Sequence, residues 1–208
     1  MPTFVHNETG KKIFFAHIPR TAGRFVEANL LANNFEWGDS HLDTGLGVMS
    51  VVNNIEIAHY HRKYYQKYLN VEEDTPQFSI VRNPLTRFIS GSIYLKRTYG
   101  NDIQSQMEDP MLFGSMIQNL PFEGSWNWYR PQVDFLSNQT NIWKFENKIG
   151  NEFSFWLSDI IGIRLKFDEG IDYPKSHDEG NKLKMSSALE SNIRGAYSKD
   201  FEVLYQNM

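Results

Sequence analysis

The sequence predicts a three-layer α/β domain in which a mainly parallel central sheet is flanked by helices. Short apolar runs typical of strands alternate along the chain with longer segments whose apolar residues recur at helical spacing. The chain of 208 residues is long enough to bury one sizeable core. No repeat or interdomain linker divides it, so we expect residues 1–208 to form a single domain.

The strands are predicted from four short apolar runs, each bounded by polar or turn-forming residues. The first run is almost continuously apolar, which is typical of a parallel strand that is buried on both faces. The predicted strands are residues 11–18, 55–58, 77–81 and 141–146.

The helices are predicted from apolar residues that recur three or four positions apart. Thr21 can cap the first helix, and Gly195 can break the last one. Pro84 suits the first turn of its helix because it has no N–H group to satisfy there. The predicted helices are residues 22–33, 62–69, 84–99, 111–120, 150–161 and 186–205. Mostly loop is expected at residues 34–54 (with a short helix near 48–52 as an option), 101–110, 121–127 and 168–184.

The composition limits the classes of function. The net charge of −4 gives no overall basic character for nucleic-acid binding. The absence of cysteine excludes disulfides, thiolate metal sites and cysteine nucleophiles, and no spacing of His, Asp and Glu indicates a metal site. The N-terminus lacks a signal-peptide pattern, and no apolar run approaches the roughly 18 residues of a membrane helix. We therefore expect a cytoplasmic protein without a membrane segment.

The segment His17–Arg24 joins the first predicted strand to the first predicted helix. A loop in this position directs backbone N–H groups and the positive end of the helix dipole at one point. Arg20, Thr21 and Arg24 add side-chain donors. The Gly-x-x-x-x-Gly-Lys-Ser/Thr pattern of nucleoside-triphosphate loops is missing, which disfavours ATP hydrolysis. The sequence thus predicts a phosphate- or sulfate-binding loop.

Further polar residues follow the other predicted strands. The carboxyl ends of parallel strands meet at one edge of a sheet, so these residues should approach the first loop. Arg82 ends one strand and Ser90 lies two turns into the next helix, a pair that can bind a phosphate or else be a solvated Arg and a packing Ser. His59 and His61 follow residues 55–58 and can act as a base or lie at the surface.

Taken together, the two loops resemble the cofactor motifs of the sulfotransferase family. His17–Gly23 is similar to the 5′-phosphosulfate loop, and Phe78–Pro84 with Arg87 and Ser90 is similar to the 3′-phosphate motif. The subgroup that the chain resembles is the carbohydrate sulfotransferases, which include the heparan 2-O- and chondroitin enzymes. Three weaker matches to this subgroup are residues 129–136, 143–147 and 197–205.

The resemblance implies a P-loop-like sulfotransferase fold and an enzyme dependent on 3′-phosphoadenosine-5′-phosphosulfate (PAPS). Its sulfuryl group would pass by in-line displacement, with a His general base, to a hydroxyl of a small-molecule or glycan acceptor, leaving 3′-phosphoadenosine-5′-phosphate (PAP). A carbohydrate is the expected acceptor. The implied cofactor-binding residues are Arg20, Thr21, Ala22, Gly23, Arg24, Phe25, Arg82 and Ser90.

The implied catalytic residues are Arg20, His61 and His59, with His61 as the base and His59 as a supporting group. Family members with a single His align with either of the two. The family usually has Lys where this chain has Arg20, and an arginine can stabilise charge but cannot give up a proton. A nucleotide- or sulfoglycan-binding module with weak or no catalysis is therefore the alternative function.

Aromatic residues crowd together before Arg130. Trp126, Trp128 and Tyr129 can form a platform that stacks a base or a sugar ring, or they can be a core cluster that anchors a loop. We take Trp128, Tyr129 and Arg130 as candidate substrate-binding residues and Lys175 as a weak candidate near the cofactor. The sequence identifies neither the acceptor nor the oligomeric state.

Overall fold

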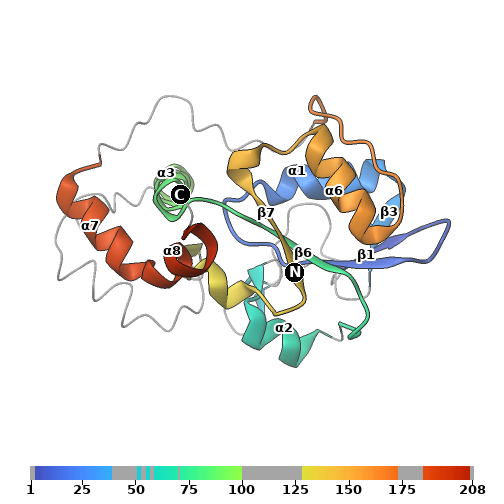
Figure 1. The fold of residues 1–208 in the computed structure, drawn as a ribbon, viewed down its shortest axis with the longest axis horizontal. Helices are drawn as coiled ribbons and strands as arrows, with labels where there is room; N and C mark the ends of the chain where they lie inside the picture. The colour runs from blue at the N-terminus through green and yellow to red at the C-terminus, as the bar shows by residue number, and fades with distance from the viewer. Residues whose placement is uncertain are drawn as a thin grey trace.

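The computed structural model describes residues 3–38, 51–52, 55–56, 59–69, 71–99, 128–172 and 185–206. Its centre is a five-stranded sheet in the order β3-β1-β2-β6-β7 (Figure 1). The strands are β1 (Thr3–His6), β2 (Lys12–Phe15), β3 (Phe35–Trp37), β6 (Gln77–Val81) and β7 (Thr140–Lys144). β2, β6 and β7 run parallel, whereas β1 is antiparallel to both of its neighbours.

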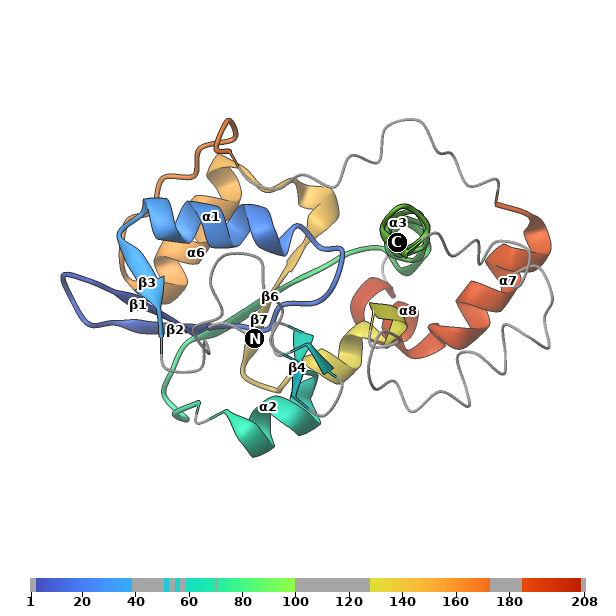
Figure 2. The same cartoon turned by 180° about the vertical axis from the view of Figure 1, so that it is seen from behind.

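Helices cover both faces of this sheet, which confirms the predicted α/β class (Figure 2). The sheet is mixed and not mainly parallel as predicted, because β1 pairs antiparallel with both β2 and β3. Side chains alternate along β2, so that Ile13 and Phe15 lie in one core cluster while Phe14 and Ala16 lie in another. The first cluster includes residues of α1 (Gly23–Ala32) and α6 (Asn151–Ile161). The second includes residues of α2 (Arg62–Tyr68), η3 (Gln132–Phe135) and α8 (Ser198–Tyr205).

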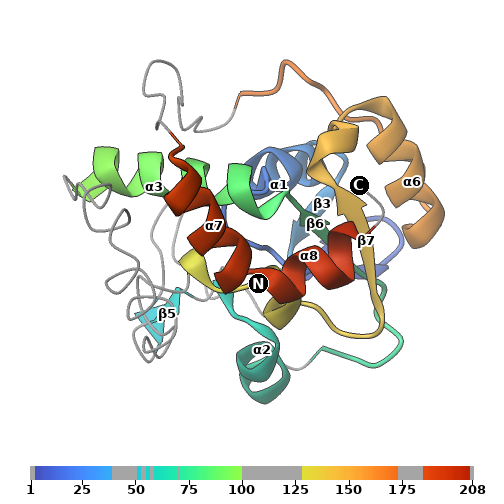
Figure 3. The same cartoon turned by 60° about the vertical axis from the view of Figure 1, so that its left-hand side comes forward.

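The remaining helices lie beside the sheet. α3 (Pro84–Tyr99) leaves the end of β6, and α7 (Ser187–Ala196) packs alongside it (Figure 3). A third core cluster joins the two helices through Phe88, Leu189 and Ile193, together with Tyr129 and Tyr197. None of the helices among the described residues is both long and apolar enough to cross a membrane.

Most predicted elements within the described residues are confirmed. β6 has the predicted bounds, α3 begins at Pro84 as expected, and the C-terminal helix is divided in two at Tyr197. The predicted helix 111–120, the loops 101–110 and 121–127, and the residues Trp126 and Lys175 lie outside the described residues.

Other details of the prediction are also wrong. Within the strand predicted at 55–58, Ile55–Glu56 does not enter the central sheet: it forms β5, which pairs antiparallel with β4 (Val51–Val52) in a separate two-stranded sheet. Val51–Val52 is extended, so the short helix offered as an option near 48–52 is wrong at these two residues. β1 and β3 were not predicted, and β1 reverses into β2 through a turn in which Gly10 has φ 67°. Thr21 does not cap α1, because its hydroxyl donates to the Ile18 carbonyl instead.

Candidate functional site

The loop between β2 and α1 has an unusual backbone. Arg20 and Ala22 both have φ 68°, in the left-handed region that residues other than Gly rarely adopt. Backbone turns of this kind direct N–H groups into a concavity suited to an anion. The Thr21 side chain is fully buried and braces the loop from within, donating to the Ile18 carbonyl at 2.8 Å. The loop therefore has the geometry expected of an anion site at the N-terminus of α1.

The His17 side chain packs between this loop and α1. Its Nδ1 lies 2.8 Å from Glu27 Oε1 on α1, and its Nε2 occupies the space beside Gly23. A Cβ atom on Gly23 would lie 1.7 Å from that nitrogen, so the position admits only glycine while His17 keeps its place. Burial would raise the pKa of Glu27, but the charge and hydrogen bond of His17 hold it below its usual value.

The structure brings the two predicted loops together. Arg20 donates to the Ser90 hydroxyl from Nε at 3.0 Å and from Nη2 at 2.8 Å. Arg82 Nη1 lies 3.4 Å from the Arg20 carbonyl oxygen, and its guanidinium lies over the Phe145 ring at 4.5 Å. Two guanidinium groups and one hydroxyl thus lie around the ends of β2 and β6. The sequence predicts that Arg20 and Arg82 with Ser90 converge, because the carboxyl ends of parallel strands meet at one edge of a sheet.

A row of rings connects Arg20 with His59. The Arg20 guanidinium lies 4.9 Å from the Tyr94 ring centroid, and Tyr94 stacks on Trp128 at 4.7 Å. The Trp128 ring meets the His59 ring edge to face at 5.3 Å. Trp128 and His59 therefore lie on the same side of the candidate site as Arg20.

His59 is held by the loop that follows β2. Its Nδ1 lies 3.2 Å from the His17 carbonyl oxygen, and because a carbonyl only accepts, Nδ1 carries the proton. In the neutral ring Nε2 is then the basic nitrogen. Burial, followed by the charge of His17, holds the pKa of His59 well below its usual value. His59 is accordingly neutral at physiological pH.

His61 has different ring neighbours from His59. It occupies the N-cap position of α2, and its ring lies 4.6 Å from that of Tyr64. Its Nε2 is buried and has no hydrogen-bond partner among the described residues. Burial and the charges of Arg130 and Lys63 lower its pKa to about 4. The charge of Arg130 therefore acts on the His61 ring.

The three candidate substrate residues differ in their surroundings. Trp128 is partly exposed, whereas Tyr129 is 3% exposed within the cluster formed by α3 and α7. The Tyr129 carbonyl accepts a hydrogen bond of 2.6 Å from the Tyr197 hydroxyl. Arg130 pairs with Asp134 at 3.1 Å. Tyr129 thus packs in the core, whereas Trp128 contacts the His59 ring and the charge of Arg130 acts on His61.

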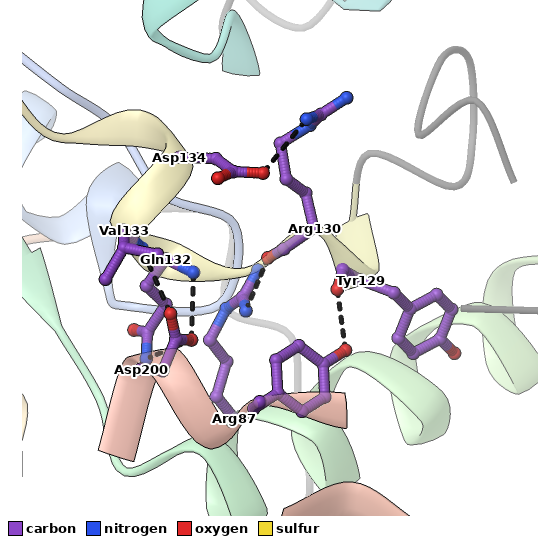
Figure 4. Close-up of polar contacts among 8 residues, drawn as sticks. Arg87, Tyr129, Arg130, Gln132, Val133, Asp134 and Asp200 are labelled. Carbon is purple, nitrogen blue, oxygen red and sulfur yellow. Dashed lines mark hydrogen bonds and ion pairs between the residues drawn. The ribbon is translucent and has the colours of Figure 1, made fainter. Parts of the chain in front are cut away.

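Arg87 has a structural role that the sequence did not reveal. Its buried guanidinium donates to the carbonyl oxygens of Pro19, Trp128 and Arg130 at 3.1, 3.0 and 3.0 Å. Figure 4 shows it pointing toward the Arg130 backbone. It therefore ties the loop after β2 to the segment that carries Trp128. The sequence feature that could have indicated this burial is its position: Arg87 comes directly before Phe88, on the side of α3 that faces the core.

Comparisons with known proteins agree with the resemblance seen in the sequence. Residues 2–151, well over half of the chain, match the model of the Sulfotransferase family. This region contains the loop around Arg20, both histidines and the turn at Arg82. Comparisons with curated proteins and with solved structures find no match. On the strength of the family match, this chain belongs to the sulfotransferase family.

Proposed function

We propose that this protein is a PAPS-dependent sulfotransferase with a P-loop-like, three-layer fold, and that its acceptor is a carbohydrate hydroxyl. One observation carries the proposal: Arg20, Ser90 and Arg82, from two motifs far apart in the chain, contact one another at the ends of β2 and β6. A nucleotide with phosphate groups at both ends of its ribose needs cationic donors of this kind. Membership of the sulfotransferase family supports the same reading.

The donors around the loop fit such a nucleotide. The loop of Arg20 to Arg24 would hold the 5′-phosphosulfate, since it opens α1 with two left-handed residues and carries two arginines. Arg82 and Ser90 would hold the 3′-phosphate. When bound, the nucleotide would supply the sulfuryl group. The guanidinium of Arg20 would stabilise negative charge there, as donors aimed at a developing charge do.

The contacts of His59 support it as the general base. The His17 carbonyl fixes the proton on Nδ1, so Nε2 is the basic nitrogen that would accept the proton of an acceptor hydroxyl. A neutral ring is the form that can accept a proton. His61, the base implied by the resemblance, is the other candidate, and its buried Nε2 has no hydrogen-bond partner among the described residues. Trp128 and Arg130 are our candidates for contacting the acceptor.

A binding module without turnover is the second candidate function. It is favoured by one observation: in place of the family's usual lysine, Arg20 is engaged by Ser90 and by the Tyr94 ring. The two functions are separated by incubating the protein with sulfur-labelled PAPS and a panel of glycans and small hydroxyl compounds. We expect label on a carbohydrate. Binding of PAP without label transfer to any acceptor would instead identify a binding module.

A further inference from the structure

The turn at Arg82 and Asn83 is held by an unusual pair of side chains. Gln132 contacts both backbone groups of Arg82: its Nε2 donates to the Arg82 carbonyl at 2.8 Å, and its Oε1 accepts the Arg82 N–H at 2.9 Å. The side chain thereby extends the hydrogen bonding of β6 by one residue. Glu146 holds the next residue, because its Oε1 accepts the Asn83 N–H at 2.6 Å.

Both of these side chains are in turn held by α8. Asp200 is fully buried, and its Oδ2 accepts from the Gln132 backbone N–H at 2.9 Å and lies 3.4 Å from Gln132 Nε2. Its Oδ1 accepts the Val133 N–H at 3.1 Å. Figure 4 shows the carboxylate beneath Gln132 and Val133. The contacts thus run from Asp200 through Gln132 to the backbone of Arg82.

The second connection begins at the end of α8. The Tyr205 hydroxyl donates to Glu146 Oε2 at 3.1 Å, while the other oxygen of the same carboxylate holds Asn83. Lys144, two residues before Glu146, lies with its ammonium 4.9 Å from the Tyr205 ring centroid. The contacts therefore run from Tyr205 through Glu146 to the backbone of Asn83.

Arg82 is part of the turn, so a shift of the turn's backbone would also move the Arg82 guanidinium. That guanidinium contacts the Arg20 carbonyl, the Thr86 hydroxyl and the Phe145 ring, and these neighbours surround the place assigned to the 3′-phosphate. A shift of about 1 Å in a binding group is enough to weaken its interaction greatly. α8 lies beyond the residues that match the family model, which end at 151.

We propose that α8 is a positioning element that holds the Arg82–Asn83 turn from two sides, through Asp200–Gln132 and Tyr205–Glu146, and thereby sets the affinity for the 3′-phosphate of the nucleotide. The inference rests on the proposed function for its ligand. Asp200 and Tyr205 touch no nucleotide in this account and act only through the turn. Their role can be tested both on the turn itself and on nucleotide binding.

The first test measures amide hydrogen exchange by NMR in the full chain. Asp200→Asn removes the charged acceptor below Gln132, so the Arg82 amide should exchange about tenfold faster relative to the amides of Ser79 and Ile80 within β6. Tyr205→Phe removes one hydroxyl and should act on the Asn83 amide in the same way, with a smaller effect of about threefold. Equal acceleration of all these amides, or none, would overturn the positioning role.

The second test measures PAP affinity by calorimetry. We expect Kd to rise about tenfold in Asp200→Asn, which corresponds to about 1.4 kcal/mol, and less in Tyr205→Phe. In an Arg82→Ala background neither substitution should change Kd further, because both act through Arg82. Unchanged Kd in the single variants, with normal binding by the wild type, would contradict the inference.

Two control variants separate positioning from stability. Glu190→Gln removes a carboxylate from an exposed ion pair with Arg194 on α7, and it should leave both the Arg82 amide and Kd unchanged. Tyr197→Phe removes a buried hydroxyl that donates to Tyr129, and it should lower stability without raising Kd. If the wild type itself binds no PAP, the proposed function fails, and the exchange of the Arg82 and Asn83 amides still decides the role of α8.

Discussion

Arg20 and Ser90 are joined by two hydrogen bonds, from Nε at 3.0 Å and from Nη2 at 2.8 Å to the same hydroxyl oxygen. The contact links the loop before α1 to the second turn of α3. It brings a residue of the loop proposed to hold the 5′-phosphosulfate against a residue proposed to hold the 3′-phosphate. The two segments therefore meet in space, as the proposed single nucleotide site requires, and Arg20 stands where the motif that the chain resembles usually has lysine.

Two substitutions of Arg20 distinguish the effect of its positive charge from the effect of its planar guanidinium group. Arg20→Lys keeps the positive charge but cannot keep both bonds to Ser90, so we expect the rate of sulfuryl transfer to stay within about tenfold of the wild type. Arg20→Ala removes the charge and should lower kcat by about 100-fold or more. Steady-state kinetics with the best acceptor checks both. Equal rates for Arg20→Ala and the wild type would show that Arg20 does not contribute to sulfuryl transfer.

The two histidines can be told apart by kinetics. If His59 is the base, His59→Ala should lower kcat by about 100-fold or more, while PAP affinity stays near that of the wild type. His61→Ala, the matched variant two residues away, should cost much less. A greater loss in His61→Ala would transfer the role of base to His61, as the resemblance implies.

Gly23 is predicted to be intolerant of a side chain. Gly23→Ala would place a methyl group 1.7 Å from His17 Nε2, so the ring must move, at a cost of about 1–3 kcal/mol in the free energy of unfolding. Urea denaturation measures this loss. Gly195→Ala on α7, where no atom lies within 4 Å of the added carbon, should instead be neutral or stabilising by up to about 1 kcal/mol.

The same Gly23→Ala change should cost less when His17 is first replaced by Ala, since the clashing ring is then absent. Equal losses in both backgrounds would show that Gly23 is constrained by something other than His17.

The stability of the protein should rise with pH between about 4 and 6.5. His61 has a native pKa of about 4, against an ordinary histidine value of 6.5, so in this window the unfolded chain binds a proton that the folded chain does not. Each pH unit of such a difference contributes up to about 1.4 kcal/mol per group. His59, with its pKa lowered by burial, contributes in the same direction.

His61→Gln removes one of these groups. The unfolding free energy of the variant, measured in urea at pH 5 and pH 6.5, should change by about 1–2 kcal/mol less than that of the wild type over this interval. An identical pH dependence in both proteins would mean that the folded state does not favour neutral His61.

Local pattern was sufficient to predict much of the fold and the meeting of the two loops. The apolar run at β6, ended by Arg82-Asn83-Pro84, specifies a strand followed directly by a helix, and both are found with those bounds. Because β2 and β6 are parallel neighbours, the residues after them lie at the same edge. Arg20 and Arg82 could therefore be placed together before any contact was known.

The rest depended on partners that no local pattern identifies. Ile55–Glu56 has strand character, but its pairing with Val51–Val52 and not with the central sheet is decided by tertiary packing. Asp200 reads as an ordinary acidic residue in the first turn of a helix. Its role arises from Gln132 and Val133, which are distant in sequence and close only in the fold.

The most direct test of the account is calorimetric titration of the protein with PAP, because the central claim is that the two loops form one site for this nucleotide. The wild type should bind at PAP concentrations below about 1 mM, and Arg82→Ala should bind about 10- to 100-fold more weakly, the loss expected for a hydrogen bond to a charged group. Arg164→Ala, which removes an exposed arginine after α6, should bind like the wild type. No heat of binding for the wild type, or equal affinity of Arg82→Ala and the wild type, would contradict the account.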